Sequence, residues 1–471
     1  MAETLRPDLC VIGGGSGGLT VAAGAAQMGA SVVLVERGRM GGDCLNTGCV
    51  PSKALLAAAA AAQAARGGAA FGVTPAGAPQ VDMAAVRAHV RSVIARIEPH
   101  DSVARFEGLG VRVVQQHAAF TDPATVRAGD VTIRARRFVI ATGSRPAVPP
   151  IPGLEAVPFL TTETVFDLDV RPDHLLVLGG GPVGVELGQA FRRLGSAVTI
   201  IDAADILGRE DPELAAVVTG RLTAEGVTLL PRTRVEAVHP DGNGVVLATG
   251  AGRLRGSHLL VAVGRAPVTD GLGLAAAGIE TGPAGIVTDA RLRTGNRRVY
   301  AIGDVAGRGQ YTHLAGYHAG IVIRSVLFRL PSRATAAIPR AIYTDPELAA
   351  AGLSEAEARA RHGDGIEVLR APFAENDRAL AERADEGLVK VVVTRRGRIL
   401  GAAICGRHAG ELIQPWVLAI ARGLRIGAVA GLVAPYPTRG EASKRAAGAY
   451  FTPRLFSPRM RKVVRLLSRL G

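Results

Sequence analysis

Cysteine and aromatic residues are scarce in this sequence of 471 residues. It contains four cysteines and one tryptophan, and aromatic residues make up 4% of the chain. A secreted disulfide framework would need more cysteines, so we expect a reducing compartment in which a few cysteines are kept for chemistry. Glycine, by contrast, occurs 60 times, and 48% of the chain is hydrophobic. This composition and length predict a large core with many tight turns, divided over about three domains.

Long hydrophobic runs are also missing. The longest uncharged apolar run, residues 54–65, is too short and too rich in alanine to span a bilayer. The N-terminus shows no charged leader followed by a hydrophobic block, because a strand and a glycine-rich loop are expected to begin by Asp8. Together these observations predict a cytoplasmic protein.

Acidic residues are fewer than basic ones, with 41 against 55, which gives a formal net charge of +14. Only four of the basic residues are lysines. An excess of arginine that accompanies an excess of alanine indicates a bias in composition more than a binding surface, so we predict no nucleic-acid partner.

Two cysteines lie in a segment rich in turn-forming residues, GGDCLNTGCVPSK, which begins at Gly41. A disulfide needs Cα atoms roughly 4.4–6.8 Å apart, so the turn at residues 46–48 must fold the chain back for Cys44 and Cys49 to meet. Pro51 suits the first turn of the alanine-rich helix expected next, which places Cys49 beside a helix N-terminus, where the thiolate is favoured. The segment predicts a redox-active pair in preference to two unrelated buried cysteines.

The remaining cysteines, Cys10 and Cys405, each lie in an apolar run. Such cysteines behave as small hydrophobic residues, so we expect both in the core.

Residues 8–36 follow the pattern of strand, glycine-rich loop, helix and strand. The expected elements are a strand over residues 8–12, a helix over 19–28 and a strand over 31–35. The loop glycines of G-x-G-x-x-G are Gly13, Gly15 and Gly18. They allow a tight turn, let a pyrophosphate approach the backbone and let the helix pack on the strand. Glu36 ends the second strand, where it can accept hydrogen bonds from a ribose, so a dinucleotide site is predicted here.

The same pattern recurs later in the chain. The expected elements are a strand over residues 175–178, a helix over 185–193 and a strand over 197–201. The loop glycines are Gly179, Gly181 and Gly184. Because the cysteine pair follows the first loop, we expect the flavin there and a nicotinamide nucleotide at the second. Asp202 ends the second strand and would bind the 2′-hydroxyl of NAD but repel the 2′-phosphate of NADP, so NADH is favoured over NADPH.

Together these motifs resemble the class I pyridine nucleotide–disulfide oxidoreductases, the family of dihydrolipoyl dehydrogenase, glutathione reductase and mercuric reductase. The resemblance covers the chain up to about Phe451. Its segments are residues 13–36, 41–53, 141–146, 179–202, 263–267 and 301–304. It implies an FAD-dependent enzyme that oxidises NAD(P)H and acts as a homodimer. In such a protein Cys49 would face the flavin, and Cys44 would face the substrate as the interchange thiol.

The resemblance also implies further cofactor contacts. Thr142 and Gly143 would end the first FAD segment, and Asp304 would bind the ribityl or phosphate side of the flavin nucleotide. The other positions that it implies near a cofactor are Ala118, Gly264 and Ala315.

Lys53 and Glu186 would form an ion pair close to the flavin N5 atom in a protein of this family. The alternative for Glu186 is an ordinary carboxylate on a helix face. Its position directly after a glycine-rich loop favours the ion pair.

The implied fold is α/β, with two Rossmann-type dinucleotide-binding domains and a C-terminal α+β dimerisation domain. The expected boundaries are 1–148 and 268–335 for FAD binding, 149–267 for NAD binding, 336–450 for dimerisation and 451–471 for a basic tail. In the dimerisation domain, alternating apolar residues predict strands over 387–393 and 399–405, followed by a helix over 411–422.

One catalytic position departs from the disulfide reductases of this family. They carry a histidine that exchanges protons with the substrate thiol, and a glutamate five residues later that orients it. Here Glu441 is in register, but the histidine position is Tyr436. A phenol with a reference pKa near 10 is a poor proton acceptor at neutral pH, and loss of such a base costs about 10²–10⁴-fold in rate. This substitution argues against efficient turnover of dihydrolipoamide or glutathione.

Mercuric reductases also place tyrosine there, because they deliver a metal ion. Other segments that resemble them are residues 210–212, 378–380, 387–390 and 410–414. However, no cysteine follows Cys405, so their C-terminal cysteine pair is missing, as is their N-terminal metal-trapping domain. No resident metal is expected, since His313, His318 and His408 are not spaced as ligands. We therefore predict a mercuric reductase-like oxidoreductase without the delivery tail, with a dihydrolipoyl dehydrogenase-type or other disulfide reductase as the alternative.

The last 21 residues, 451–471, hold six basic residues and no acidic one. Apolar residues recur there at helical spacing, namely Met460, Val463, Val464, Leu467 and Leu470, opposite Arg461, Lys462, Arg465 and Arg469. Such a helix packs on its own protein, which we favour, or makes weak contact with an anionic membrane. A membrane-associated flavoprotein with a binding role is therefore a further alternative to the enzyme.

Overall fold

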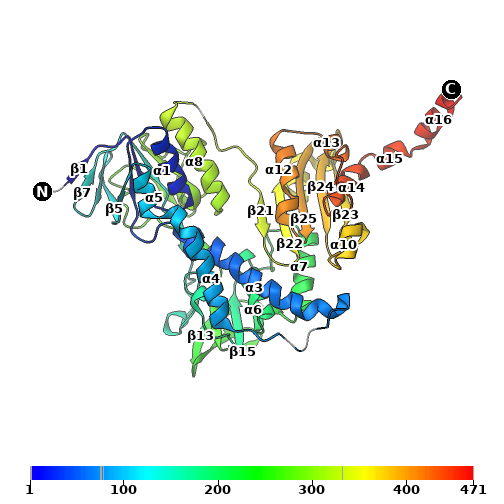
Figure 1. The fold of residues 1–471 in the computed structure, drawn as a ribbon, viewed down its shortest axis with the longest axis horizontal. Helices are drawn as coiled ribbons and strands as arrows, with labels where there is room; N and C mark the ends of the chain where they lie inside the picture. The colour runs from blue at the N-terminus through cyan, green and yellow to red at the C-terminus, as the bar shows by residue number, and fades with distance from the viewer. Residues whose placement is uncertain (1–2, 75–76, 78, 331, 470–471) are drawn as a thin grey trace. The chain divides into compact units, whose positions relative to one another are not determined.

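The computed structural model describes residues 3–74, 77, 79–330 and 332–469. The chain divides into two compact units. The first unit contains residues 1–179, 193–197 and 235–335, and the second contains residues 180–192, 198–234 and 336–471. Figure 1 draws the chain as a ribbon and labels many of its helices and strands.

A five-stranded parallel sheet forms the centre of the first unit, in the order β20-β8-β2-β3-β4. Its strands are β2 (Leu9–Ile12), β3 (Val32–Val35), β4 (Val111–Val114), β8 (Arg137–Ile140) and β20 (Val299–Ala301). Every residue of β2 and β3 is buried. Continuous apolar runs of this kind are expected where both faces of a parallel sheet are covered.

Alternate residues of β2 contribute to different cores, because successive side chains of a strand point to opposite faces. Leu9 packs with residues of helices α1 (Ser16–Gln27) and α8 (Thr312–Leu327). Cys10 packs on the other side, against a four-stranded sheet of order β1-β7-β6-β5, so its predicted place in the core is confirmed. The strands of this second sheet are β1 (Glu3–Leu5), β5 (Ala118–Asp122), β6 (Thr125–Ala128) and β7 (Val131–Ile133).

The cysteine segment of the same unit forms α2 (Gly42–Asn46) and the start of α3 (Cys49–Gly67). Two further helices follow it, α4 (Met83–Ile97) and α5 (Val103–Gly108). The remaining strands of the first unit are β9 (Ser144–Pro146), β10 (His174–Leu178), β13 (Val235–Asp241), β14 (Gly244–Thr249), β15 (Gly252–Gly256), β16 (His258–Val261), β17 (Arg265–Pro267), β18 (Thr281–Gly282) and β19 (Gly285–Ile286).

A five-stranded antiparallel sheet dominates the second unit, in the order β21-β22-β25-β24-β23. Its strands are β21 (Arg340–Ile342), β22 (Glu347–Gly352), β23 (Ile366–Pro372), β24 (Leu388–Thr394) and β25 (Ile399–Gly406). The predicted strands over 387–393 and 399–405 are thus confirmed as the antiparallel neighbours β24 and β25. Cys405 is fully buried, as expected.

Helices complete the second unit, and those between residues 377 and 449 pack against this sheet. The helices of the unit are α6 (Pro182–Arg193), α7 (Pro212–Ala224), α9 (Glu355–His362), α10 (Asp377–Ala381), α11 (Ala409–Leu412), α12 (Gln414–Ala421), α13 (Ile426–Ala430), α14 (Glu441–Ala449), α15 (Thr452–Leu455) and α16 (Pro458–Leu467). The unit also contains β11 (Ala197–Ile201) and β12 (Thr228–Leu230), which pair in parallel. The predicted helix over 411–422 is confirmed as α11 and α12, which are separated only by Ile413, whose backbone is also helical; Pro415 lies in the first turn of α12, where proline is tolerated.

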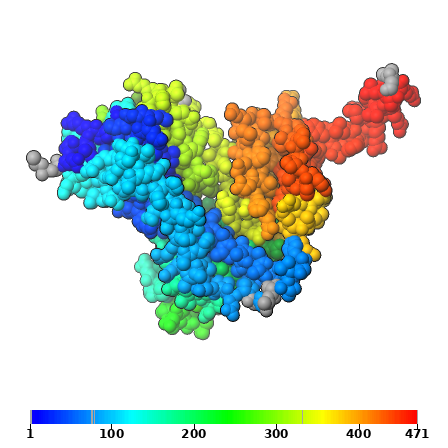
Figure 2. Space-filling model, in the orientation of Figure 1, coloured from blue at the N-terminus to red at the C-terminus, as the bar shows by residue number. Residues whose placement is uncertain are grey.

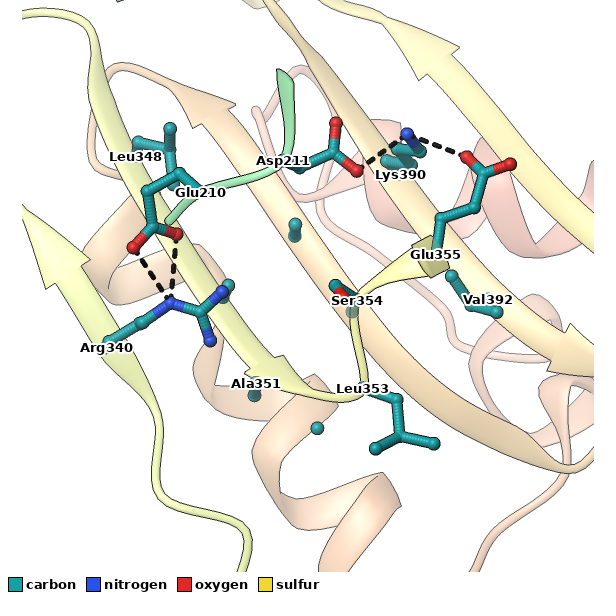
Figure 3. A pocket seen from close by; sticks show the side chains of 14 residues that line it. Glu210, Asp211, Arg340, Leu348, Ala351, Leu353, Ser354, Glu355, Lys390 and Val392 are labelled. Atoms are coloured by element: carbon teal, nitrogen blue, oxygen red, sulfur yellow. Dashed lines mark hydrogen bonds and ion pairs between the residues drawn. The ribbon is translucent and has the colours of Figure 1, made fainter. Parts of the chain in front are cut away.

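A buried ion cluster joins the N-terminus of α7 to the antiparallel sheet (Figure 3). Lys390 on β24 is 5% exposed, and its Nζ atom lies 2.7 Å from Asp211, 2.9 Å from Glu355 and 3.0 Å from Glu213. Asp211 is also the N-cap of α7 and accepts a hydrogen bond from the backbone of Glu213. The segments 210–212 and 387–390, which the sequence singled out, therefore meet in the fold.

The tail forms α15 and α16, which confirms the helix predicted from the spacing of its apolar residues. The prediction that α16 packs on its own protein was wrong for the described chain, because none of its residues is buried. Leu470 lies outside the described residues.

None of the described helices is both long enough and apolar enough to cross a membrane.

Candidate functional site

The first glycine-rich loop has the geometry of a phosphate cradle. Gly13 has a φ of +109°, and a Cβ atom there would lie 2.4 Å from the carbonyl oxygen of Ala141. A Cβ atom on Gly18 would lie 1.9 Å from the carbonyl oxygen of Gly13, so only glycine allows α1 to start so close to β2. At Gly15 a Cβ atom would meet nothing closer than Gly42, at 3.8 Å. This open space beside the N-terminus of α1 fits a pyrophosphate.

Glu36 closes the other end of this loop. Its carboxylate accepts hydrogen bonds from the backbone nitrogens of Gly14, at 2.5 Å, and Gly38, at 2.6 Å. The carboxylate is thereby fixed at the end of β3, where the ribose of a dinucleotide binds.

A cleft continues from Glu36 along the ends of the strands. It is lined by Gly13, Glu36, Ala118, Thr142 and Val268, among others. Thr142 donates a hydrogen bond of 2.7 Å to the carbonyl oxygen of Val268, and Gly143 follows it with a φ of +69°. The cradle, the carboxylate and the cleft together fit the adenosine and pyrophosphate parts of FAD.

The redox-active pair lies beside this cradle on the same unit. Helix α2 ends at Asn46, the chain turns at residues 47–48, and α3 begins at Cys49. The predicted turn and helix N-terminus are therefore confirmed. The Cys49 sulfur lies 3.3 Å from the hydroxyl oxygen of Thr312, which begins α8.

The pKa values of the two thiols are shifted in opposite directions. The hydrogen bond from the Cys44 thiol lowers the pKa of Cys49 to about 6, and Thr312 and Lys53 act in the same direction. The same hydrogen bond raises the pKa of Cys44 above its usual range. Cys49 is thus the thiolate of the reduced pair and Cys44 the thiol. Burial, together with the negative charge of Glu386, raises the pKa of Cys405 to about 12, as expected for a cysteine without chemistry.

A chain of hydrogen bonds connects the cysteine segment with Asp304. Arg265 pairs with Asp43, the neighbour of Cys44, at 3.1 Å, and its Nε atom donates to the Ser144 hydroxyl at 2.7 Å. Ser144 donates in turn to Asp304, at 2.5 Å. Burial raises the pKa of Asp304 above its usual value. Gly264, which precedes Arg265, has a φ of +131°, and its carbonyl oxygen accepts from the backbone of Ala147.

His318 positions the turn that carries Asp304. It is 1% exposed, and its Nδ1 atom accepts a hydrogen bond of 3.2 Å from the backbone of Gly303. Burial lowers the pKa of His318 to about 4, so the ring is neutral and can accept this bond. Ala315 is buried on the same helix, and its Cβ atom lies within 3.2 Å of the position that a Cβ atom on Gly17 or on Gly303 would take.

The second glycine-rich loop repeats the geometry of the first. Gly179 has a φ of +114°, and a Cβ atom there would lie 2.4 Å from the carbonyl oxygen of Ala262. Gly181 faces open space, and Gly184 is buried in the first turn of α6. Asp202 accepts from the backbone of Gly180 at 2.6 Å and of Ala204 at 2.7 Å. Asp202 is therefore held in the same way as Glu36.

Lys53 and Glu186 belong to different units, and their pairing stays a prediction. Lys53 lies on α3, where its Nζ atom donates to the Ser52 hydroxyl at 3.4 Å. Glu186 lies on α6, is 5% exposed, and accepts a hydrogen bond of 2.9 Å from the backbone of Tyr343.

The segment around Tyr436 lies on the surface of the second unit. Tyr436 is 72% exposed, and its phenol donates a hydrogen bond of 2.9 Å to Asp377. Glu441 begins α14 and accepts from the backbone of Thr438 at 3.1 Å. Glu441 thus fixes the loop that carries Tyr436.

Four residues that contact the predicted site residues were not predicted from the sequence. Thr312, Arg265 and Ser144 lie around the cysteine segment and Asp304, and Asp377 contacts Tyr436. Two of them lie in motifs that the sequence did reveal, since Ser144 follows Gly143 and Arg265 follows Gly264. Thr312 carries no such signal, because it is 263 residues from its partner Cys49. Among the described residues, no group of three or more histidine, cysteine or acidic side chains is arranged to hold a metal ion.

Two glycine-rich loops of one design and a cysteine pair with unequal acidities define a flavin- and nicotinamide-dependent disulfide oxidoreductase. The model of the pyridine nucleotide-disulphide oxidoreductase family matches residues 7–319, and the model of its dimerisation domain matches residues 338–447. The chain belongs to this family. It has the family's α/β fold, with dinucleotide-binding domains and a C-terminal dimerisation domain, and it is an FAD-dependent enzyme that uses NAD(P)H.

Several known enzymes are similar to the chain over nearly its whole length. A mercuric reductase of Streptomyces lividans is 38% identical over 456 residues, which are 94% of this chain and 96% of the relative. Dihydrolipoyl dehydrogenase 2 of Haloarcula marismortui is 35% identical over 463 residues, 95% of this chain and 97% of the relative.

Among solved structures, the HOCl-induced flavoprotein disulfide reductase RclA of Escherichia coli matches with a TM-score of 0.85 and 27% identity. The match covers 94% of this chain and 99% of that one. LpdA of Mycobacterium tuberculosis matches with a TM-score of 0.86 and 27% identity, over 96% of this chain and 100% of that one.

Proposed function

We propose that this protein is a mercuric reductase-like oxidoreductase that passes electrons from NADH to a thiophilic metal–thiol complex through Cys44 and Cys49. The observation that carries the proposal is the placement of the pair: Cys49 begins α3, its sulfur lies 3.3 Å from the Thr312 hydroxyl, and the hydrogen bond with Cys44 lowers its pKa. A pair in which one sulfur is held as thiolate is suited to thiol chemistry at neutral pH.

Residues 13–18, Glu36 and the cleft at Thr142 would hold FAD, which supplies two-electron transfer between the nicotinamide and the disulfide. Ala118, Gly143, Gly264, Asp304 and Ala315 are proposed to complete this site. The Lys53–Glu186 pair is proposed to lie where the nicotinamide approaches.

Each cysteine has a separate role in the proposal. Cys49, which faces the cofactor, stays a thiolate when the pair is reduced, and the Thr312 hydroxyl stabilises its charge. Cys44 keeps its proton until substrate arrives, because its pKa is raised. It then displaces one thiol ligand of a soft metal ion, for which thiolates are preferred ligands, or one half of a disulfide, and its proton leaves on the displaced thiol.

Asp202 supports NADH as the donor. Its carboxylate is fixed by two backbone hydrogen bonds at the end of β11. A fixed negative charge at this point accepts the 2′-hydroxyl of NAD and repels a 2′-phosphate. Gly179, Gly181 and Gly184 would hold the pyrophosphate.

The dimerisation domain supports a homodimer, in which each subunit would present Tyr436 and Glu441 to the pair of its partner. Tyr436 would then contact the substrate as a phenol that keeps its proton, because the hydrogen bond to Asp377 raises its pKa. A protonated phenol donates a hydrogen bond or binds a metal ion weakly, but it does not take up a proton. This property supports a metal–thiol acceptor over an organic disulfide.

The proposal is tested by anaerobic titration of the holoenzyme with NADH, followed by steady-state oxidation of NADH with Hg²⁺–thiol complex and with lipoamide in parallel. We expect a long-wavelength absorbance band from the thiolate next to the flavin, and faster turnover with the mercury complex. The variants Cys44→Ala and Cys49→Ala should abolish turnover of both acceptors while retaining FAD. Bleaching of the flavin without the thiolate band, or no reaction with either nucleotide, would contradict the proposal.

A second candidate is a disulfide reductase of the dihydrolipoyl dehydrogenase type. Glu441 favours it, because this carboxylate lies in register with the glutamate that orients the base in such enzymes and is fixed in place by Thr438. If lipoamide turns over faster than the mercury complex, this second function replaces the first. Tyr436→His should then raise lipoamide turnover by about 10²-fold, the lower end of what a positioned base contributes.

A further inference from the structure

The C-terminal helix carries apolar side chains that no part of the described chain covers. Val464 and Leu467 of α16 are 57% and 58% exposed, and Phe456, just before the helix, is 67% exposed. Figure 2 shows the segment in red, with its side chains open to solvent on the face drawn. Large apolar side chains grouped in this way on an exposed element mark an interaction surface.

The helix separates its apolar and basic side chains onto opposite faces. Met460, Val463, Val464 and Leu467 recur at the spacing that places residues on one side of a helix. The opposite face carries Arg461, Lys462, Arg465 and Arg469. No acidic residue occurs after Glu441.

Local interactions suffice to form this helix. The hydroxyl of Ser457 accepts a hydrogen bond of 3.3 Å from the backbone of Met460, and Pro458 occupies the first helical position. A capping serine and a proline at this place are common helix starts. The start of the helix is therefore fixed by neighbouring residues, and contact with a surface would stabilise the rest of so short a helix.

We propose that α16 is a peripheral membrane helix, which lies in the plane of an anionic lipid surface with its apolar face towards the acyl chains. Charge complementarity favours this partner, since a segment with basic residues only attracts anionic headgroups. The apolar stripe selects lipid over nucleic acid, because a phosphate backbone would satisfy the arginines but leave the stripe in water. A bilayer surface accommodates both faces at once.

The proposal does not depend on the acceptor of the enzyme. Cys44, Cys49 and the two glycine-rich loops lie outside the tail, so membrane binding would add a location to a catalyst that works without it. Failure of one proposal therefore leaves the other standing.

The test is co-sedimentation of the full-length holoenzyme with vesicles of phosphatidylcholine alone and of phosphatidylcholine with one quarter phosphatidylglycerol. We expect binding to the anionic vesicles only. The variant Val463→Ser/Val464→Ser/Leu467→Ser keeps every charge and should lower the partition coefficient at least about tenfold, because it removes buried apolar area. The variant Arg461→Gln/Lys462→Gln/Arg465→Gln should lower it about fivefold for each charge removed.

A matched control removes the same number of charges elsewhere. Arg396, Arg422 and Arg425 are exposed on the second unit and are not part of residues 451–471. Their triple change to glutamine should leave vesicle binding within twofold of the original protein. All variants should retain FAD and the rate of NADH oxidation, which shows that they are folded.

Three results would overturn the proposal. The first is the absence of binding to anionic vesicles. The second is equal binding by the serine variant, which would mean that general positive charge is the cause. The third is binding of a single-stranded RNA that needs the basic face of α16 but not its apolar face, which would assign the helix to nucleic acid.

Discussion

The phenol of Tyr436 donates a hydrogen bond of 2.9 Å to the carboxylate of Asp377. Asp377 begins the short helix α10, so the acceptor is held by an element that packs on the antiparallel sheet. This pairing raises the pKa of Tyr436 above its ordinary value. At the position where the resemblance predicts a base, the chain thus has a phenol whose pKa is raised above that of a free tyrosine.

The first prediction concerns this pair. Asp377→Asn removes the negative charge that favours the protonated phenol, so the pKa of Tyr436 should fall towards its usual value. The measurement is a spectrophotometric titration of tyrosinate, with Tyr436→Phe to identify which transition belongs to this residue. If the two titration curves, with and without Asp377, coincide after subtraction of the phenylalanine variant, the hydrogen bond does not form in solution.

The second prediction concerns the thiolate of the redox pair. Since Cys49 has a pKa of about 6, its alkylation by iodoacetamide in the reduced enzyme should fall to half its maximum as the pH drops through about 6. In Cys44→Ala the donor is lost, and the midpoint should rise towards the value of about 8.5 for a free cysteine. Mass spectrometry of the labelled peptides assigns the site. Cys10 and Cys405 are buried and serve as internal controls that should stay unlabelled.

The third prediction concerns the phosphate cradle. Gly18→Ala places a Cβ atom 1.9 Å from the carbonyl oxygen of Gly13, so α1 must move away from β2. The purified variant should contain less than about a tenth of the normal flavin, because the backbone groups that bind pyrophosphate would be displaced. Gly220→Ala is the control, since this helical glycine on α7 has open space around it and should keep full flavin content. Normal flavin content in Gly18→Ala would show that the loop tolerates a side chain.

The fourth prediction concerns the buried ion cluster of Figure 3. Lys390→Met leaves the carboxylates of Asp211 and Glu355 without their shared cation, and both are largely buried. Removal of one partner from a buried ion pair typically costs about 3–5 kcal/mol, so the variant should unfold at markedly lower denaturant concentration. Arg232→Gln, which breaks only the exposed pair with Asp205, should cost less than about 1 kcal/mol. If both variants lose the same free energy of unfolding, the buried cluster contributes no more to stability than an exposed ion pair.

The fifth prediction concerns the choice of nucleotide. Asp202→Asn removes the charge that repels a 2′-phosphate, so the ratio of kcat/KM for NADH to that for NADPH should fall by about tenfold or more. Steady-state kinetics with both nucleotides measures the ratio. Asp205→Asn, an equal change three residues further on, should leave the ratio unchanged. A ratio that does not respond to Asp202→Asn would place the selection of the nucleotide elsewhere.

The elements around the glycine-rich loops could be predicted closely from the sequence. The strand over 8–12, the helix over 19–28 and the strand over 31–35 correspond to β2, α1 and β3 within a few residues. Local rules suffice here, because steric limits on φ and the periods of strand and helix are set by neighbouring residues. The segment predicted as a helix over 411–422 is helical as α11 and α12, and only the division at Ile413 was missed, because the apolar pattern continues across it.

By itself, the sequence determined the two dinucleotide loops, the acids that end them and the cysteine pair at a helix N-terminus, since each of these features forms within about thirty residues. Only the tertiary structure decided that Thr312 supports Cys49, that Asp377 holds Tyr436 and that Arg265 joins Asp43 to Ser144. It also decided that α16 stands uncovered. The hydrogen bonds and ion pairs join residues that are far apart in the chain, and the exposure of α16 depends on whether another element packs against it. Neither can be read from a local sequence pattern.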